Sequence, residues 1–299
     1  MRVLITGASG LIGSALVPRL EAGGHAVTRL VRSRERAGDG AYFWDPEIGV
    51  LDEAALRGTD AVVHLAGETV AGRWTREKKR RIHDSRILGT RLLSEAIATA
   101  DPRPAVFICA SAVGIYGDRG DEELTEASPR GGGFLAEVVD EWEAVTKPAA
   151  HAGVRVVNVR SGVVLSRESG ALASQLLPFR LGLGGPLGGG RQFVSWISIE
   201  DEAAAIEHVL AHGELSGPVN LVAPNPVTNR EFAKTLARVL RRPAFLPTPV
   251  LPLRLAFGTE FVEEVLLASA RVMPAQLLAS GYRFRDPELE PALSGLLRG

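Results

Sequence analysis

The chain has 299 residues, of which 45% are hydrophobic and 23% charged, and its formal net charge is −1 at pH 7. This length suffices for one large core with an appended lobe, and the near-neutral charge argues against a general nucleic-acid-binding surface. The single cysteine, Cys109, excludes an internal disulfide framework, and no apolar run reaches membrane-spanning length. We therefore expect a soluble, cytoplasmic protein without a signal peptide and without nucleic-acid or membrane partners.

The first residues combine an apolar run at Arg2–Thr6, a glycine turn and a helical pattern over Leu11–Gly23. In a strand–turn–helix unit, Gly7 permits the tight turn, Gly10 lets a pyrophosphate approach the backbone, and Gly13 lets the helix pack closely on the strand. The helix N-terminus then offers free N–H groups to phosphates. The predicted phosphate-binding residues are Gly7, Ser9, Gly10, Leu11 and Ile12.

The second predicted strand, Ala26–Val31, indicates which dinucleotide binds. An acidic residue after this strand selects NAD through the adenine ribose, whereas a cation accommodates the 2′-phosphate of NADP. Here Arg32 stands at that position and no acid is present. A guanidinium can hold a phosphate through two parallel hydrogen bonds, so we predict NADP as the cofactor. The alternative is that Arg32 is a surface cation on a solvated loop.

Short apolar runs then alternate with helical patterns along the chain. This alternation predicts an α/β fold, a Rossmann-like doubly wound parallel sheet with a smaller C-terminal substrate lobe. The further strands are expected at Ala41–Trp44, Ala61–Leu65, Ala105–Ala110, Val154–Val159 and Val219–Val222. The helices are expected at Glu53–Arg57, Thr75–Ala100, Phe134–His151, Ile199–His212 and Asn229–Leu240.

We place the NADP-binding domain at residues 1–160 and the substrate lobe with a C-terminal helical region at 161–299. Elements up to about residue 240 are expected to return in part to the first domain. The glycine-rich stretch from Pro178 to Gly190 is typical of a loop. Four prolines between Pro243 and Pro252 predict an extended linker, and the pattern from Leu253 onward predicts helix.

The N-terminal glycine pattern resembles that of the extended short-chain dehydrogenase/reductase superfamily, which includes NAD(P)-dependent sugar-nucleotide epimerases and dehydratases. Further motifs follow in the order expected for that superfamily. They are the fourth-strand motif at 64–67, the central-helix motif at 89–93, the serine strand at 111–117, the segment closing over the nicotinamide at 160–164, and the lobe motif at 193–201.

A closer resemblance is to a divergent branch of epimerase-family proteins, the YfcH-like or SDR39U1-like family. Its hallmarks match this chain at Ala66-Gly67-Glu68, at Arg73-Trp74-Thr75, at Ser85-Arg86 and along the string from Leu177 to Pro186. The branch also carries an additional C-terminal helical region of the DUF1731 type, which matches the chain around Arg271–Pro274. The resemblance covers nearly the whole chain.

The chemistry of the superfamily requires a tyrosine and a lysine four residues later on one helix face. The lysine ammonium lowers the pKa of the phenol, which then moves a proton while the nicotinamide moves a hydride. At the best-matching positions this chain has Phe134 and Val138, which can neither exchange a proton nor hold a charge. Four residues after the three tyrosines, Tyr42, Tyr116 and Tyr282, stand Pro46, Gly120 and Asp286.

The resemblance also implies cofactor contacts away from the glycine turn. Arg86 occupies the place of the usual asparagine of the central helix, where it could substitute for the missing lysine charge. The alternative is an exposed helix arginine. The remaining predicted cofactor-binding residues are Leu65, Ala66, Gly67, Glu68, Ala110, Gly162 and Val163.

For residual chemistry the candidates are Ser111, which matches the serine of the superfamily, and Tyr116 on the loop that follows. Their structural alternatives are a loop-capping hydroxyl and a packed tyrosine. Three acids, Glu68, Glu141 and Glu143, are candidate bases if burial raises their pKa. We predict no metal site, because His208 and His212 at helical spacing lack a third ligand.

Two functions follow from these observations. The first is an NADP-binding, epimerase-family oxidoreductase that acts on an unknown small molecule without the usual tyrosine–lysine pair. The second is a catalytically silent NADP(H)-binding or redox-sensing protein. The sequence does not determine the oligomeric state, and a homodimer is one possible assembly.

Overall fold

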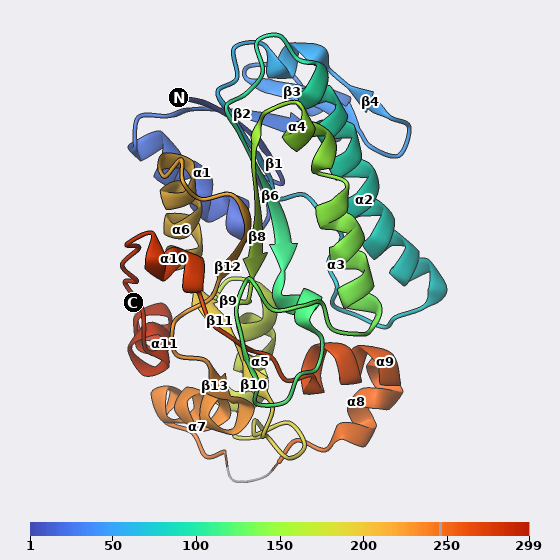
Figure 1. Ribbon diagram of the computed structural model, residues 1–299. Helices are drawn as coiled ribbons and strands as arrows, with labels where there is room; N and C mark the ends of the chain where they lie inside the picture. The colour runs from blue at the N-terminus through green and yellow to red at the C-terminus, as the bar shows by residue number, and fades with distance from the viewer. Residues whose placement is uncertain (245–246, 299) are drawn as a thin grey trace.

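The computed structural model describes residues 1–244 and 247–298 and is built around one eight-stranded sheet (Figure 1). The strand order is β12-β8-β6-β5-β1-β2-β3-β4. All neighbours are parallel except β3 and β4, which are antiparallel. This order confirms the predicted Rossmann-like, doubly wound fold, and the chain reverses its direction of winding between β1 and β5.

The seven parallel strands agree with the seven predicted strands to within two residues at each end. Their nearly continuous apolar sequences reflect burial on both sheet faces, and every residue from Ala61 to His64 is buried. The strands of the main sheet are β1 (Arg2–Thr6), β2 (Ala26–Val31), β3 (Ala41–Asp45), β4 (Val50–Leu51), β5 (Ala61–His64), β6 (Val106–Ala112), β8 (Arg155–Ser161) and β12 (Gly217–Leu221).

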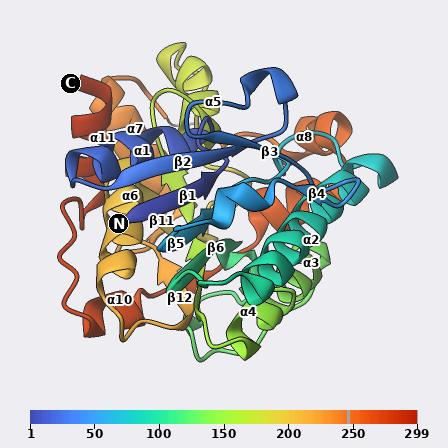
Figure 2. The same cartoon turned by 90° about the horizontal axis from the view of Figure 1, so that it is seen from above.

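Helices cover both faces of this sheet (Figure 2). One face carries α1 (Leu11–Ala22) and α6 (Ile199–Ala211), whose apolar residues form a core with β1 and β8. The other carries α2 (Arg76–Thr99), α3 (Phe134–Ala144) and α4 (Lys147–His151), with Trp142 and Phe107 in their core. The carboxyl ends of the parallel strands lie together at one edge of the sheet. Proteins with this fold bind their ligands at that edge.

A smaller lobe lies below that edge in the view of Figure 1 and has its own apolar core around Trp196, Phe179 and Phe232. Its helices are α5 (Gly170–Arg180), α7 (Asn229–Leu240) and α11 (Leu289–Arg298). Short strand pairs connect it: β9 (Val163–Leu165) with β11 (Trp196–Ser198), β10 (Phe193–Val194) with β13 (Val227–Thr228), and β7 (Glu123–Leu124) with β14 (Arg271–Val272).

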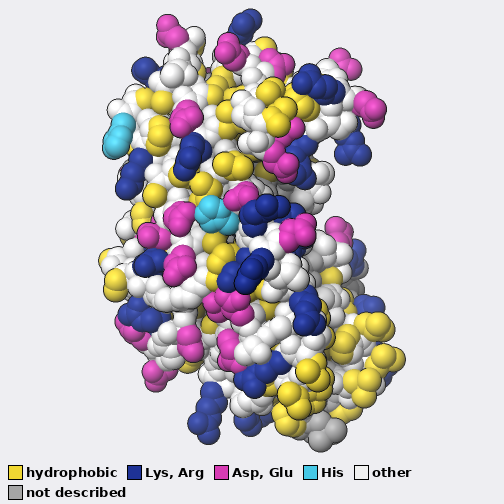
Figure 3. All heavy atoms as spheres, turned by 90° about the vertical axis from the view of Figure 1, so that its right-hand side faces the viewer, with side chains coloured by type: hydrophobic (Ala, Val, Ile, Leu, Met, Phe, Trp, Pro, Cys, Tyr) yellow, Lys and Arg dark blue, Asp and Glu magenta, His cyan; other side chains and the backbone are white. Residues whose placement is uncertain are grey.

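The C-terminal region adds α8 (Val250–Phe257), α9 (Thr259–Phe261), a π-helical turn at Val262–Leu267 and α10 (Ala275–Ala279). No residue of α8 is buried, although the helix contains a single charged side chain. Its exposed residues include Leu251, Leu255 and Phe257. Apolar side chains accordingly gather on the lower part of the face in Figure 3.

Two predicted elements were wrong in detail. The single helix expected over Phe134–His151 is two helices, because Pro148 lacks an N–H and its ring would clash with the carbonyl of Ala144 in a continuous helix. The extended linker expected between Pro243 and Pro252 includes residues 245–246, which lie outside the described part of the chain. Its C-terminal end is helical, because Pro252 falls in the first turn of α8, where a backbone N–H is not needed.

Pro178 also lies inside α5, so the glycine-rich loop begins only after Arg180. Strand β12 returns to the main sheet beside β8, so the chain crosses from the lobe back to the Rossmann layers. The domain boundary at residue 160 stays a prediction.

Across the described ranges, 1–244 and 247–298, no helix combines the length and apolar character needed to cross a lipid bilayer.

Candidate functional site

The glycine turn lies at the switch point between β1 and β5. Gly7 has φ of +68°, and a Cβ atom on it would lie 2.8 Å from the backbone N of Ala66. A Cβ on Gly13 would lie only 2.2 Å from the carbonyl oxygen of Gly7. Both positions therefore require glycine, because the backbone, rather than a movable side chain, fills the space.

Helix α1 begins at Leu11, directly after this turn in the chain. Its N-cap residue is Gly10, and no side chain caps the first turn. The backbone N–H groups of the first helical residues have no intrahelical acceptors, and they coincide with the positive end of the helix dipole. Ser9 and Gly10 are exposed, and Leu11 and Ile12 are half-buried. This is the geometry that a phosphate-binding turn needs, and the contacts of these residues with a phosphate stay a prediction.

A buried hydrogen-bond centre fixes the loop that faces the cradle. Thr6 Oγ1 accepts hydrogen bonds from the backbone N–H groups of Leu65 and Ala66, both at 3.1 Å, and lies 2.6 Å from His64 Nδ1. Its hydroxyl hydrogen is therefore directed to the His64 ring. Burial, aided by the positive charge of Arg86, lowers the pKa of His64 to about 3, so the ring is neutral.

Glu68, which follows this loop, is surrounded by cations. Its carboxylate lies 2.6 Å from Lys78 Nζ and 4.0 Å from Arg81 Nε. The hydrogen bond from Lys78, together with the charges of Lys78, Arg81 and Arg32, lowers the pKa of Glu68, although its partial burial opposes this. Four cations, counting Arg86, share this one carboxylate, so the corner has excess positive charge for a phosphate group.

Arg86 reaches this corner from α2 and is not an exposed helix arginine. Its Nη1 donates to the carbonyl oxygens of Glu68 at 3.0 Å and Ile82 at 2.9 Å, and the guanidinium lies 5.0 Å from the ring centre of Trp142. Burial lowers the pKa of Arg86 to about 10. Among the described residues no carboxylate forms an ion pair with Arg86, although the charge of Glu68 acts on it through space, and this leaves a half-buried cation available to an anionic ligand.

Arg32 is exposed and follows β2 as predicted. Within the described part of the chain it has no hydrogen bond or ion pair, and its charge acts on Glu68 through space. By contrast, the neighbouring Arg34 stacks on the ring of Phe43 at 4.1 Å. Arg32 is therefore free to approach a ligand from the solvent side.

Ser111 lies near the carboxyl end of β6 and forms part of a buried ionic network. Its hydroxyl donates to Glu143 Oε1 at 2.5 Å. Arg160 grips the same carboxylate with two parallel hydrogen bonds, each of 2.8 Å. Burial opposes the charge of Arg160, but the hydrogen bonds and charge of Glu143 raise its pKa above the usual value.

Tyr116 continues this network on the side away from Ser111. The phenol is fully buried, donates to Asn220 Oδ1 at 2.8 Å, and accepts from Arg160 Nη1 at 3.0 Å. Burial, outweighing the charge of Arg160, raises the pKa of Tyr116. The predicted catalytic roles of Ser111 and Tyr116 stay predictions, and this geometry favours packing and support for Tyr116.

The position that matches the missing tyrosine is covered by other side chains. The ring of Phe134 packs edge-on against Trp74 at 5.2 Å, and Lys79 Nζ lies 4.3 Å from its centre. Glu264 from the C-terminal region accepts hydrogen bonds from the backbone N–H groups of Phe134 and Leu135, at 3.0 and 2.9 Å. The C-terminal region thus caps helix α3 at the point where the usual pair would begin.

The remaining predicted cofactor residues line the other side of the same edge. Ala110, Gly162 and Val163 are half-buried. A Cβ on Gly162 would lie 2.5 Å from the carbonyl oxygen of Ser195, so the chain must pass there without a side chain. Val163 enters the β9–β11 pair opposite Trp196.

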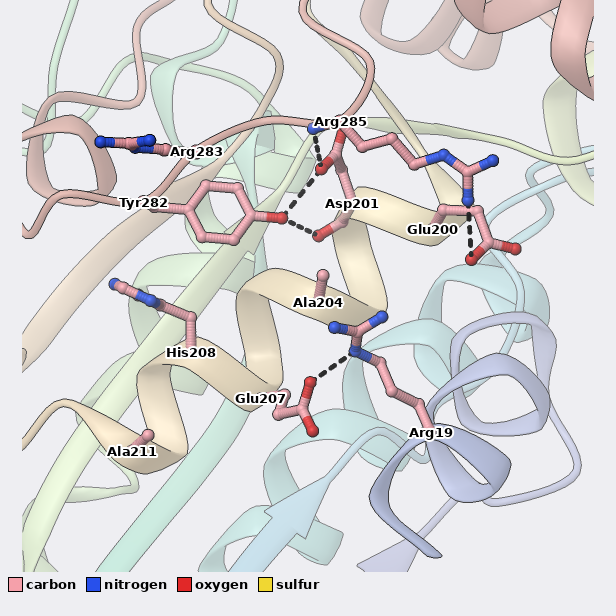
Figure 4. Close-up of a pocket in the computed structure, with 10 residues that line it drawn as sticks. All are labelled: Arg19, Glu200, Asp201, Ala204, Glu207, His208, Ala211, Tyr282, Arg283 and Arg285. Atoms are coloured by element: carbon pink, nitrogen blue, oxygen red, sulfur yellow. Dashed lines mark hydrogen bonds and ion pairs between the residues drawn. The ribbon is translucent and has the colours of Figure 1, made fainter. Parts of the chain in front are cut away.

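A separate hollow of about 430 Å³ lies away from this edge, between α1, α6 and the segment after α10 (Figure 4). Most of its charged groups already have partners, although no side-chain contact is seen for Arg283 among the described residues. Arg19 pairs with Glu207 at 2.6 Å, and the carboxylate of Asp201 accepts from the hydroxyl of Tyr282 at 2.9 Å and from the backbone of Arg285. These contacts attach the C-terminal segment to α6, and we assign no chemistry to the hollow.

Cys109 and the histidine pair of α6 make local contacts only. Cys109 is fully buried, and burial raises its pKa to about 12, which fits an inert thiol. His208 and His212 stack with ring centres 3.6 Å apart, and His208 pairs with Ser280. In residues 1–244 and 247–298 no group of three or more His, Cys, Asp or Glu side chains is arranged to hold a metal.

Sequence reasoning missed the partners of the site residues. The sequence analysis does not single out Lys78, and it identifies Glu143 only as one of three candidate bases and Arg160 only as the start of a motif. The order of strands could have paired Ser111 with Arg160, because β6 and β8 are adjacent and these residues are in register. The capping role of Glu264 has no local sequence signal.

Comparison with known proteins places the chain in a family. Residues 3–221 match the model of the "NAD dependent epimerase/dehydratase family", and residues 248–296 match a "Domain of unknown function (DUF1731)". The chain is 46% identical to an epimerase family protein of Mycobacterium bovis, Mb2239, over 97% of this chain and 96% of that one. It is 40% identical to human epimerase family protein SDR39U1, over 99% of this chain and 100% of that one.

Comparison with solved structures agrees with this family assignment. The fold matches the crystal structure of human epimerase family protein SDR39U1 (isoform 2) with NADPH, with a TM-score of 0.91, 38% identity and full coverage of both chains. It also matches a UDP-glucose 4-epimerase of Thermus thermophilus in complex with NAD, with a TM-score of 0.76 and 24% identity over 100% of this chain and 98% of that one, a likeness of fold alone. The chain therefore belongs to the NAD dependent epimerase/dehydratase family and is similar to its SDR39U1 members.

Proposed function

We propose that this protein binds NADPH along the carboxyl edge of its sheet and acts as an oxidoreductase on a small-molecule substrate. The observation that carries the proposal is a glycine turn that excludes a Cβ atom at Gly7 and Gly13, together with two arginines, Arg32 and Arg86, that form no ion pair among the described residues. The similar human protein that was crystallised with NADPH supports it.

The residues present fit this cofactor. The backbone of Gly7–Ile12 would hold the pyrophosphate, Arg32 would meet the 2′-phosphate, and the neutral, narrow segment at Gly162 would lie against the nicotinamide. When bound, the dinucleotide supplies hydride chemistry. Arg86 would bring the positive charge that the absent lysine supplies elsewhere in the superfamily.

The cofactor choice is tested by Arg32→Asp. We expect the Kd for NADPH to rise roughly 10- to 100-fold and the Kd for NADH to change little, because only NADPH carries the 2′-phosphate. Titration followed by the fluorescence of the reduced nicotinamide measures both constants. Arg36→Asp, on the same exposed turn, is the matched control, and equal weakening of the two cofactors would contradict the assignment.

A second function is favoured by the covered position of Phe134. If no other group moves a proton, the protein would bind NADP(H) without turnover and act as a redox-sensing protein. Absorbance of NADPH in the presence of carbonyl compounds and nucleotide sugars separates the two functions. Turnover supports the oxidoreductase, and tight binding without turnover over a broad panel supports the sensor.

A further inference from the structure

The strongest unassigned feature is a set of exposed leucines at the lower end of the smaller lobe in Figure 1. Leu177 and Leu181 lie one turn apart on α5, and Leu251 and Leu255 lie one turn apart on α8, so each pair shares a helix face. With Leu183, which follows α5, these side chains are between 64% and 75% exposed. Exposed apolar side chains that gather on one surface of a protein mark a site of interaction.

Backbone contacts hold α5 and α8 together at this end of the lobe. The segment after α5 forms a parallel bridge with the segment before α8, between Leu187 and Thr248, and the Thr248 N–H donates to the carbonyl oxygen of Pro186 at 2.7 Å. Arg242, which follows α7, donates from Nε to the carbonyl oxygen of Arg180 at 2.8 Å. The exposed leucines therefore lie on segments that are attached to one another, with arginines beside them.

The two segments that form this end of the lobe are strongly basic. Residues 170–194 and 232–259 contain six arginines and one lysine but no Asp or Glu, although the net charge of the whole chain is −1. Among the described residues, only Arg238 and Arg254 of these cations form an ion pair, with carboxylates of α11 and of the π-helical turn. The other five cations are not neutralised in this way and give the surface a positive potential.

This charge favours an anionic partner over a second copy of the chain. In a two-fold symmetric contact a patch meets itself, so the exposed Arg180 and Arg241 of one copy would face the same cations of the other. Leucines exposed to this degree protrude from the surface and can enter a lipid layer one by one. Exposed leucines with arginines beside them are typical of segments that lie on an anionic bilayer.

We propose that this surface attaches the protein peripherally to an anionic lipid bilayer. Leu251 and Leu255, with Leu181 from the end of α5, enter the boundary between headgroups and acyl chains, while Arg180 and Arg241 contact lipid phosphates. The expectation of no membrane partner came from the lack of a membrane-spanning run, and a protein that lies on a bilayer needs no such run. The attachment does not rest on the proposed function.

The apolar contribution is tested by sedimentation of the full chain with vesicles that contain equal amounts of phosphatidylcholine and phosphatidylglycerol. Leu255→Glu should lower the partition coefficient on the order of 100-fold, because a leucine no longer leaves water and a negative charge meets anionic lipid. Ile48→Glu is the matched control. Ile48 is 67% exposed and lies between β3 and β4, at the opposite end of the molecule in Figure 1, so this variant should bind like the wild type.

The electrostatic contribution is tested with the double variant Arg180→Gln/Arg241→Gln. We expect the partition coefficient to fall about 30-fold, at about a factor of five for each arginine removed from an anionic surface. Arg36→Gln/Arg283→Gln removes two exposed arginines outside this surface and controls for total charge. Binding of the wild type should also weaken as the salt concentration is raised and with vesicles of phosphatidylcholine alone.

Circular dichroism and urea midpoints establish that each variant is folded, and only exposed side chains are changed. Failure of the wild type to bind the mixed vesicles would overturn the proposal. So would equal binding to phosphatidylcholine alone, or binding that Leu255→Glu leaves unchanged. A dimer in light scattering that Leu255→Glu dissociates would also overturn it, because a second copy of the chain would then cover this surface.

Discussion

Two carboxyl groups, of the half-buried Glu143 and the fully buried Glu202, meet serine hydroxyls near the ends of neighbouring strands, but only Glu143 meets a cation. Glu143 accepts from Ser111 and is gripped by Arg160. Glu202 accepts from Ser161 at 2.5 Å, and its second oxygen is buried without a partner. Burial raises the pKa of Glu202 to about 8, despite the Ser161 hydrogen bond that opposes this shift.

The comparison shows that a serine alone does not support a buried negative charge. The pair at Glu143 adds a fixed guanidinium, whose charge and two hydrogen bonds offset the cost of removing the carboxylate from water. At Glu202 the protein keeps the proton instead. The carboxyl of Glu143 is therefore a charged acceptor near the carboxyl ends of the strands, and that of Glu202 is a neutral group on the buried side of α6.

The largest effect is expected from removing the cation. Arg160→Met leaves the Glu143 carboxylate buried without its partner, and we expect the free energy of unfolding to fall by roughly 3–5 kcal/mol. Urea denaturation at neutral pH measures it. The double variant Arg160→Met/Glu143→Leu should recover most of the loss, since both charges are then gone, and a loss as large as that of the single variant would contradict this account.

A smaller, pH-dependent effect is expected at Glu202. The folded protein retains a proton that the unfolded chain releases, so this group's contribution is full at low pH and is lost as pH rises toward about 8. His64, with its pKa lowered to about 3, acts in the opposite sense below 6.5. Between pH 6.5 and 8, Glu202 should therefore lower the stability of the wild type by up to about 2 kcal/mol. His83, whose pKa burial lowers but Asp84 and Glu141 raise above its usual value, acts in the same direction in this range.

Glu202→Gln should remove the part of this slope that Glu202 contributes, because an amide does not titrate. Urea midpoints compared between pH 6.5 and 8 test it, with Glu200→Gln on the exposed side of the same helix as the control. An unchanged slope in Glu202→Gln would show that the proton is held elsewhere.

The smallest effect is expected at Arg86, a half-buried cation that forms no ion pair within residues 1–244 and 247–298. Arg86→Met should weaken NADPH binding about 10-fold, which corresponds to about 1.4 kcal/mol, while the free energy of unfolding without cofactor stays equal or rises. Calorimetric titration and urea denaturation give the two values. A marked loss of stability with unchanged NADPH affinity would make Arg86 a structural residue like Arg160.

The sequence by itself determined the parallel strands, the glycine turn and the position of Arg32, because these depend on local apolar runs and on glycines next to one another in the chain. It also located Ser111 at a strand end. Its errors were local too, at Pro148 and Pro252, where the place of a proline within a helix decides whether the helix continues.

Tertiary structure alone decided which charges meet. Ser111, Glu143 and Arg160 come from β6, α3 and β8, and Glu264 reaches α3 from more than a hundred residues away along the chain. Whether a carboxyl is ionised or an arginine is free depends on burial and on neighbours brought together by the packing of the layers. No periodicity or spacing in the sequence contains those distances, and so the difference between Glu143 and Glu202 became visible only in the folded chain.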